Sequence, residues 1–192
     1  MILNYLQTNW VEITGAVLSL IYLYLSIKQN INLWIFGFLA SAFYIVVFFR
    51  TGFYADMSLQ LYYLVVSVYG WTNWKYGTHQ PGKELPATNI PRRQIPRYAL
   101  ASAVIYLAYY IILAKFTDST IPIADSIVGT LSVTGTLMLA RKYIENWLVW
   151  IVADALATAL FFYKGLYPTA IIFVIYTIMA VVGFFQWKKA MA

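Results

Sequence analysis

The sequence predicts an all-α membrane protein with seven transmembrane helices, in the order three helices, one connecting helix, three helices. Three observations predict this fold class. Of the 192 residues, 62% are hydrophobic and 10% are charged, whereas a soluble domain carries about 45–50% apolar and about 25% charged residues. The apolar residues form seven long runs, and the last two runs repeat the pattern of the second and third. The lipid bilayer is therefore the expected solvent.

The seven runs have the length of membrane-spanning helices, which need about 20 mostly apolar residues. They are apolar almost throughout, whereas lipid-facing strands of a barrel alternate polar and apolar residues. A helix also pairs its backbone groups within the segment, as lipid requires. The predicted helices are Trp10–Ile27, Ile31–Phe49, Phe53–Trp74, Tyr98–Phe116, Ile121–Ala140, Trp147–Tyr163 and Leu166–Trp187.

One long connection, Lys75–Arg97, separates the third and fourth predicted helices. It contains four of the six prolines and a basic cluster, and regularly spaced prolines prevent a continuous helix. We interpret it as an extended cytoplasmic linker. The predicted domains are thus residues 1–75 (first three-helix repeat), 76–120 (basic, proline-rich linker and connecting helix) and 121–192 (second three-helix repeat).

The basic residues predict the orientation in the membrane. Three of them, Arg50, Lys115 and Lys164, fall on the side of the N-terminus, and the other ten of the 13 fall on the opposite side. The positive-inside rule places the richer side in the cytoplasm. We therefore expect the N-terminus outside and the C-terminus in the cytoplasm, and the net charge of +6 needs no nucleic-acid partner.

The internal repeat appears when the chain is shifted by 113 residues, the separation of Trp34 and Trp147. Across the 42 positions from Trp34 to Lys75, eleven residues are identical without a gap. The identical pairs include Trp34/Trp147, Tyr63/Tyr176, Gly70/Gly183 and Trp74/Trp187. Because one span lies between the two halves, the repeats should run parallel, as in SWEET-like transporters whose binding sites lie near the midplane.

The sixth predicted helix carries the main candidate site. Trp147, Trp150 and Asp154 are spaced i, i+3, i+7 and so share one face. A carboxylate inside an apolar span costs about 2.5–3.5 kcal/mol and is a functional candidate by default, although a hydrogen bond to a neighbouring helix would also explain it. Trp147 is equally explained as an interfacial anchor. Two indoles beside a carboxylate suit a flat, aromatic, cationic ligand.

The other half of the repeat offers a different set of groups. Trp34, Gly37 and Ser41 occupy the equivalent positions, so one half has bulk and charge where the other has space and a hydroxyl. Gln60 and Tyr63 extend a polar face on the third helix, and Tyr176 is the equivalent of Tyr63. Asp125, near the outer end of the fifth helix, either contacts substrate or pairs with a basic residue. The predicted substrate-binding residues are Trp147, Trp150, Asp154, Gln60, Tyr63, Ser41, Trp34, Asp125 and Tyr176.

Several classes of chemistry are excluded by missing residues. The chain has no cysteine and one histidine, His79, which argues against thiolate catalysis and against zinc sites. It has no GxxxxGK[ST] or other hydrolytic motif. We expect no enzyme activity, no metal and no cofactor. A membrane enzyme that uses Asp154 as a base would lack a second catalytic group.

The segments RKYIENWLVWIVAD (141–154), YADMSLQ (54–60) and VYGWTNW (68–74) resemble the Pnu family of bacterial vitamin transporters over nearly the whole chain. The family motif WxxWxxxN is Trp147-x-x-Trp150-x-x-x-Asp154 here. The resemblance implies seven helices in a SWEET-like arrangement and facilitated diffusion of an unphosphorylated vitamin across the inner membrane. A cytoplasmic kinase would then trap the vitamin by phosphorylation. It further implies that Trp147, Trp150 and residue 154 contact the substrate.

The departure from the motif decides which vitamin the sequence favours. The nicotinamide riboside carriers of the family, PnuC, have Asn where this chain has Asp154, and some segments look more like the thiamine carriers, PnuT. We therefore expect thiamine, with nicotinamide riboside as the alternative. A vitamin-binding subunit of an ATP-driven complex is a lesser alternative. The sequence leaves a homo-oligomer open.

Overall fold

The computed structural model describes residues 10–51, 54–78, 84–117 and 119–192, and within them it is all-helical. Seven α-helices are present in this part of the chain: α2 (Trp10–Ile27), α3 (Leu33–Thr51), α4 (Tyr54–Tyr76), α5 (Ile95–Phe116), α6 (Pro122–Ala140), α7 (Asn146–Tyr163) and α8 (Tyr167–Met191). They match the seven predicted spans to within four residues at each end. His79 lies outside the described residues.

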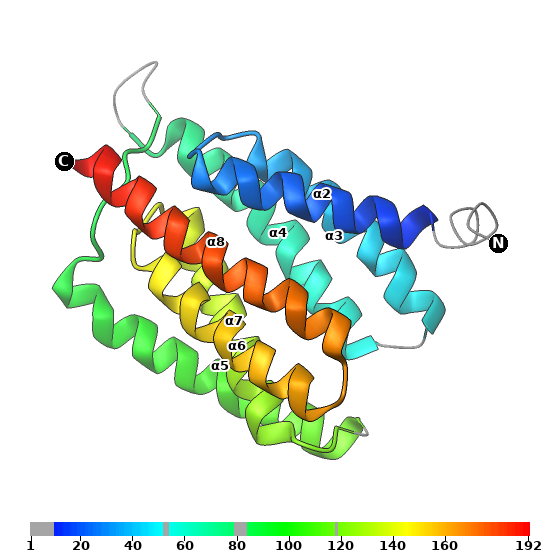
Figure 1. The fold of residues 1–192 in the computed structure, drawn as a ribbon. Coiled ribbons are helices and arrows are strands. Elements are labelled where there is room, and N and C mark those ends of the chain that lie inside the picture. The colour runs from blue at the N-terminus through cyan, green and yellow to red at the C-terminus, as the bar shows by residue number, and fades with distance from the viewer. Residues whose placement is uncertain (1–9, 52–53, 79–83, 118) are drawn as a thin grey trace. The chain divides into compact units, whose positions relative to one another are not determined.

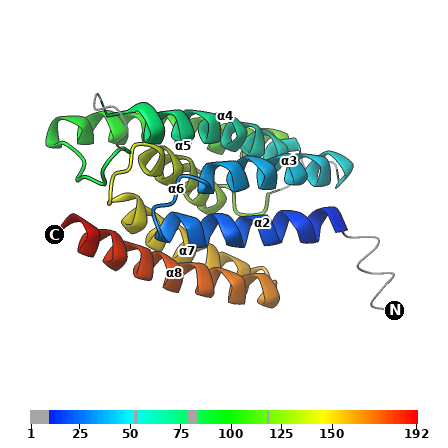
Figure 2. The same ribbon diagram turned by 90° about the horizontal axis from the view of Figure 1, so that it is seen from above.

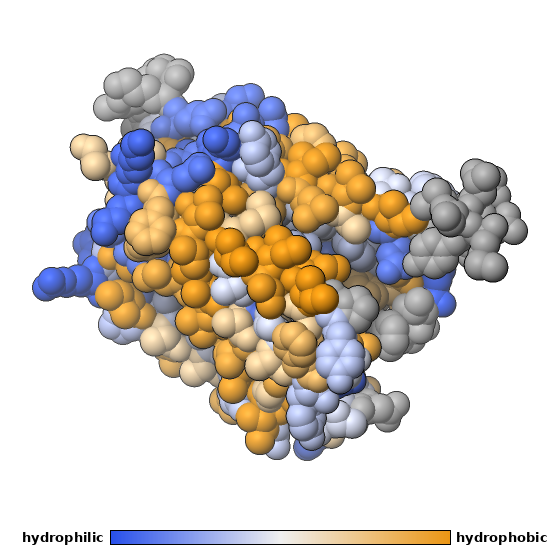
Figure 3. Space-filling view, viewed as in Figure 1, coloured by the Kyte–Doolittle hydropathy of each residue, from blue (hydrophilic) through white to orange (hydrophobic). Residues whose placement is uncertain are grey.

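Six of these helices are long and apolar enough to cross a membrane. The exception is α4, which has 23 residues but also carries Asp56, Gln60 and Lys75. Apolar side chains cover the visible face of α8, and hydrophilic side chains gather near its C-terminal end (Figure 3), where Lys188 and Lys189 form the last turn. This pattern is that of a helix in lipid with a basic end in water.

The chain divides into two compact units, residues up to Leu85 and residues from Pro86 onward. In the first unit α2 packs on α3 and α3 packs on α4. In the second unit α5 packs on α6, α6 on α7 and α7 on α8 (Figures 1 and 2). The connecting helix α5 is thus grouped with the second unit, and the three-part division at residues 75 and 120 stays a prediction.

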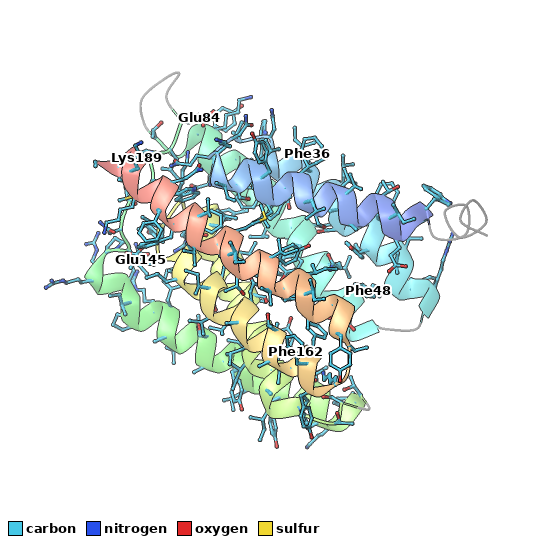
Figure 4. All side chains as sticks on the ribbon, in the orientation of Figure 1. Phe36, Phe48, Glu84, Glu145, Phe162 and Lys189 are labelled. Carbon is cyan, nitrogen blue, oxygen red and sulfur yellow. The ribbon has the colours of Figure 1, made fainter. Side chains whose placement is uncertain are left out.

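The linker is fastened to the second unit. Thr88 forms a parallel bridge with Tyr143, and the amide of Ile90 donates to the carboxylate of Glu145 at 3.0 Å. Glu145 lies in the loop before α7 (Figure 4). The next helix, α5, begins three residues earlier than predicted because Pro96 falls in its first turn, where proline is favourable.

Both units use the same turn after their first repeat helix. Gln29 has φ 54° and Lys142 has φ 58°, and these two residues are 113 positions apart. Asn30 donates to the carbonyl of Leu25, and Tyr143 donates to the carbonyl of Met138, both at 3.0 Å. This is the Schellman ending of a helix, which usually has glycine at the left-handed position. Two identical strained turns at one spacing support an origin by duplication.

Candidate functional site

Trp147, the first residue of the predicted Trp–Trp–Asp set, is a core residue of the second unit. It is 2% exposed and meets Trp187 edge to face, with ring centroids 5.7 Å apart and the planes at 83°. A Cβ at Gly183 would lie 2.6 Å from its ring carbons, so glycine is needed for the approach of α8. An interfacial anchor would expose its ring, and this indole is enclosed instead.

Trp150 lies one turn further along α7, and its side chain packs against α6. Its indole carbon Cε2 and nitrogen Nε1 would each lie 3.2 Å from a Cβ at Gly135. Glycine at 135 therefore lets the indole rest directly on the backbone of α6. Trp150 remains partly exposed, so part of its ring stays available for another contact.

Asp154 lies in the middle of α7 and is 6% exposed. Within the described part of the chain, no side chain donates a hydrogen bond to its carboxylate. Its backbone carbonyl accepts a bond of 2.8 Å from Thr158 Oγ1. Tyr176, another predicted site residue, is half-buried on α8, the helix that packs on α7. A buried carboxylate without a donor is costly in an apolar span, and a cationic ligand would offset that cost.

Asp125 occupies a different part of the second unit. Lys164 Nζ lies 2.8 Å from Oδ1 and 3.1 Å from Oδ2 of its carboxylate, and Ser119 Oγ donates to Oδ2 at 2.8 Å. Lys164 follows α7 ten residues after Asp154, about 15 Å along the helix axis. This ion pair is one of the two roles predicted for Asp125. Its contact with substrate stays a prediction.

The first unit repeats the tryptophan cluster. Trp34 is 1% exposed and meets Trp74 edge to face at 5.7 Å and 89°, while a Cβ at Gly70 would lie 2.5 Å from its Cε2 atom. These three residues are the equivalents of Trp147, Trp187 and Gly183. The indole nitrogens of Trp34 and Trp147 are both buried, and neither has a hydrogen-bond partner among the described residues.

The remaining predicted residues of the first unit lie on α3 and α4. Ser41, at the position equivalent to Asp154, is buried. Gln60 and Tyr63 are half-buried on α4. An open groove of about 360 Å³ lies between α3 and α4, and apart from Ser67 its lining is apolar: Trp34, Ile35, Phe38, Leu39, Val68 and Trp71. Most of these apolar side chains are exposed, as lipid-facing residues are, so the groove does not mark the predicted site.

Two polar residues of interest were not predicted. Asn146 is fully buried and donates from Nδ2 to the carbonyl of Tyr143 at 2.7 Å, while its Oδ1 atom has no hydrogen-bond partner in the part of the chain that the structure describes. Tyr22 of α2 lies over Gly37 of α3, where a Cβ would come within 2.9 Å of its ring. The spacing of 113 relates Tyr22 to Gly135 and Gly37 to Trp150, so the repeat contained a signal for Tyr22.

Residues 9–189 match the family described as "Nicotinamide mononucleotide transporter". The chain belongs to this family. The Pnu-type vitamin transporter predicted from the resemblance is therefore confirmed at the level of the family, and the chain is a multi-pass membrane protein of a transporter family. Within the described residues, no group of His, Cys, Asp or Glu is arranged to hold a metal ion.

Known relatives cover most of this chain. It is 24% identical over 203 residues to the "Nicotinamide riboside transporter PnuC" of Escherichia coli (strain K12), covering 93% of this chain and 85% of that one. It is 23% identical to the "Riboflavin/roseoflavin transporter RibM" of Streptomyces davaonensis, covering 93% and 84%. The solved "Vitamin B3 transporter PnuC" has a similar fold, with a TM-score of 0.74, 23% identity and coverage of 98% and 85%.

Proposed function

We propose that this Pnu-family vitamin transporter carries nicotinamide riboside across the bacterial inner membrane by facilitated diffusion. The observation that carries the proposal is Asp154, a buried carboxylate without a side-chain donor among the described residues, on the same helix face as Trp150. The pyridinium ring of nicotinamide riboside is flat and cationic. Indole faces attract cations by up to about 2 kcal/mol when desolvated, and the carboxylate supplies the opposite charge.

The choice of vitamin differs from the one that the sequence favoured. Relatives that match 93% of this chain are named for nicotinamide riboside and for riboflavin, and these names favour nicotinamide riboside over thiamine. Thiamine remains a second candidate only because its thiazolium is also a cation that Asp154 would neutralise. Phosphorylation by a cytoplasmic kinase would keep the carried vitamin inside the cell.

The transport mechanism we propose is a movement of two parallel three-helix repeats, SWEET-like in arrangement. The shared Trp–Gly–Trp clusters and the shared turns at Gln29 and Lys142 support such a repeat. We propose the N-terminus outside and the C-terminus in the cytoplasm from the distribution of Lys and Arg. The proposed substrate contacts are the predicted set, with Trp150 and Asp154 as its centre.

Binding and uptake by the purified chain test this proposal. We expect titration calorimetry to detect binding of nicotinamide riboside to the purified protein. Liposomes that contain the protein should take up nicotinamide riboside without ATP until its concentrations inside and outside are equal. Binding of thiamine or riboflavin but not nicotinamide riboside would contradict the choice of vitamin. Uptake that requires ATP and a further subunit would contradict facilitated diffusion.

Two substitutions test the role of Asp154. Asp154→Leu should lower the affinity for nicotinamide riboside about tenfold or more, because the pyridinium would then be buried without its counter-charge. The same variant should unfold at an equal or higher temperature, because a carboxylate is costly in the apolar span. Asp154→Asn keeps a polar group and should bind more tightly than Asp154→Leu. Native affinity in Asp154→Leu would exclude Asp154 from the site.

A further inference from the structure

The apolar groove of the first unit lies beside the start of α3 and the end of α4. Trp34 is in the first turn of α3 and Trp71 is near the end of α4, and both line the groove. Further from these helix ends the lining is Phe38 and Leu39 on α3 and Val68 on α4, and these three side chains are exposed. An exposed apolar surface of this kind in a membrane protein is typical of contact with lipid or with another helix.

A cation lies at the end of this groove. Ser67, Trp71 and Lys75 are spaced i, i+4, i+8 and so follow one face of α4. The Nζ atom of Lys75 lies 4.5 Å from the centroid of the Trp71 ring and 5.4 Å from that of the Tyr76 ring. The ammonium of Lys75 is therefore held over an indole that itself lines the groove.

The positive charge of Lys75 is not neutralised by its contacts. Lys75 is exposed, and the two rings that it touches are uncharged. Among the described residues, no carboxylate forms an ion pair with it. A ring face attracts a cation and leaves the charge of that cation in place. An anionic group at the end of the groove would therefore interact favourably with Lys75, whereas a neutral apolar helix would not.

The second unit retains the same pair of residues. Lys188 Nζ lies 6.0 Å from the centroid of the Phe184 ring, and these two residues are 113 positions after Lys75 and Trp71. The apolar surface is retained as well, since the equivalents of three exposed groove residues are also exposed: Leu148, Val152 and Val181. Each unit therefore places a lysine over an aromatic ring at the end of an exposed apolar surface.

We propose that the groove between α3 and α4 binds an anionic phospholipid, with one acyl chain in the groove and the phosphate at Lys75. The groove provides an apolar surface for a flexible chain, and Lys75 provides the opposite charge at its end. Basic pockets between helices on the cytoplasmic side of membrane proteins bind anionic headgroups in this way, and the orientation proposed above places Lys75 on that side. This inference goes beyond the proposed function and holds whichever vitamin is carried.

Native mass spectrometry of the delipidated full chain tests the charge at this site. The probe is an equimolar mixture of phosphatidylglycerol and phosphatidylcholine with the same acyl chains, and the singly lipidated native protein should carry mainly phosphatidylglycerol. Lys75→Gln should lower the ratio of bound phosphatidylglycerol to phosphatidylcholine about fivefold, the usual contribution of one basic residue near an anionic surface. Lys189→Gln is the matched control, because it removes the same charge from the exposed end of α8 (Figure 4). It should leave the ratio unchanged.

Two substitutions on α4 test the groove itself. Val68→Trp fills the groove and should reduce the binding of both lipids. Val65→Trp adds the same ring one turn away, at an exposed residue outside the groove lining, and should leave lipid binding unchanged.

Three results would overturn the inference. The first is equal binding of the two lipids by the native protein, and the second is an equal loss in Lys75→Gln and Lys189→Gln. The third is unchanged lipid binding in Val68→Trp. If that variant also fell from the mass of an oligomer to the mass of the monomer, the groove would be assigned to a second copy of the chain instead.

Discussion

Trp34 and Trp147 each depend on one glycine of the neighbouring helix. At Gly183 a methyl group would lie 2.6 Å from the Trp147 ring, closer than carbon atoms approach. We expect Gly183→Ala to destabilise the protein by about 1–3 kcal/mol, the usual cost of overpacking a core. A lower unfolding midpoint in detergent would show this loss of stability.

The double variant Gly183→Ala/Trp147→Phe should be destabilised by less than the sum of the two single variants, because the smaller ring leaves room for the methyl group. An unfolding midpoint in Gly183→Ala equal to that of the native protein would contradict this packing.

The ion pair between Lys164 and Asp125 gives a way to separate the two roles of Asp125. Both side chains are partly exposed, at 29% and 24%, and pairs of this kind contribute at most about 1 kcal/mol. If Asp125 acts only through Lys164, then Asp125→Asn and Lys164→Gln should have equal, small effects on the unfolding midpoint and none on uptake. Slower uptake in Asp125→Asn alone would instead support the predicted contact with substrate.

We predict that the contact between α2 and α3 can be rebuilt with the residues that α6 and α7 use, with the glycine on the first helix and the indole on the second. Gly37→Trp alone places an indole against Tyr22 and should destabilise the first unit, and Tyr22→Gly alone leaves a cavity. The double variant Tyr22→Gly/Gly37→Trp copies Gly135 and Trp150. Its unfolding midpoint should therefore lie above the value expected from adding the two single effects. Simple additivity would mean that the two crossings are not equivalent.

The elements themselves were predictable because their length and apolar content are set by the bilayer. The Gly165 turn after α7 was also marked by its residue, with φ 73°. The turns at Gln29 and Lys142, which are equivalent to each other in the repeat, have no glycine to indicate them, and residues with side chains seldom adopt a left-handed conformation. Tyr22 was missed because its signal is indirect: the repeat relates Tyr22 to Gly135 and Gly37 to Trp150, and only the contact between α2 and α3 shows that the Tyr22 ring lies over Gly37.

At the scale of the whole molecule, the repeat explains why the candidate site could be predicted only in part. Spacing alone placed Trp147, Trp150 and Asp154 on one face of α7. The spacing does not show that the ring of Trp147 is buried against Trp187, whereas the ring of Trp150 stays partly exposed. Contacts between helices divide these roles, and they depend on which residue of the neighbouring helix is small. The Trp–Gly pairs and the turns that both units share are therefore the part that the repeat made predictable, and the contacts of the residues in which the units differ are the part that it did not.

The orientation of the chain in the membrane is the last prediction, and the absence of cysteine makes it directly testable. Thr117→Cys lies between α5 and α6, at the end we assign to the outside, and Ala192→Cys lies after α8, at the basic end that we assign to the cytoplasm. Both positions are exposed. In intact cells a membrane-impermeant maleimide should label Thr117→Cys but not Ala192→Cys, and permeabilised cells should label both. The unsubstituted chain, which has no thiol, is the control. Labelling of Ala192→Cys in intact cells would reverse the assignment, and with it the inference that ten of the 13 basic residues lie inside.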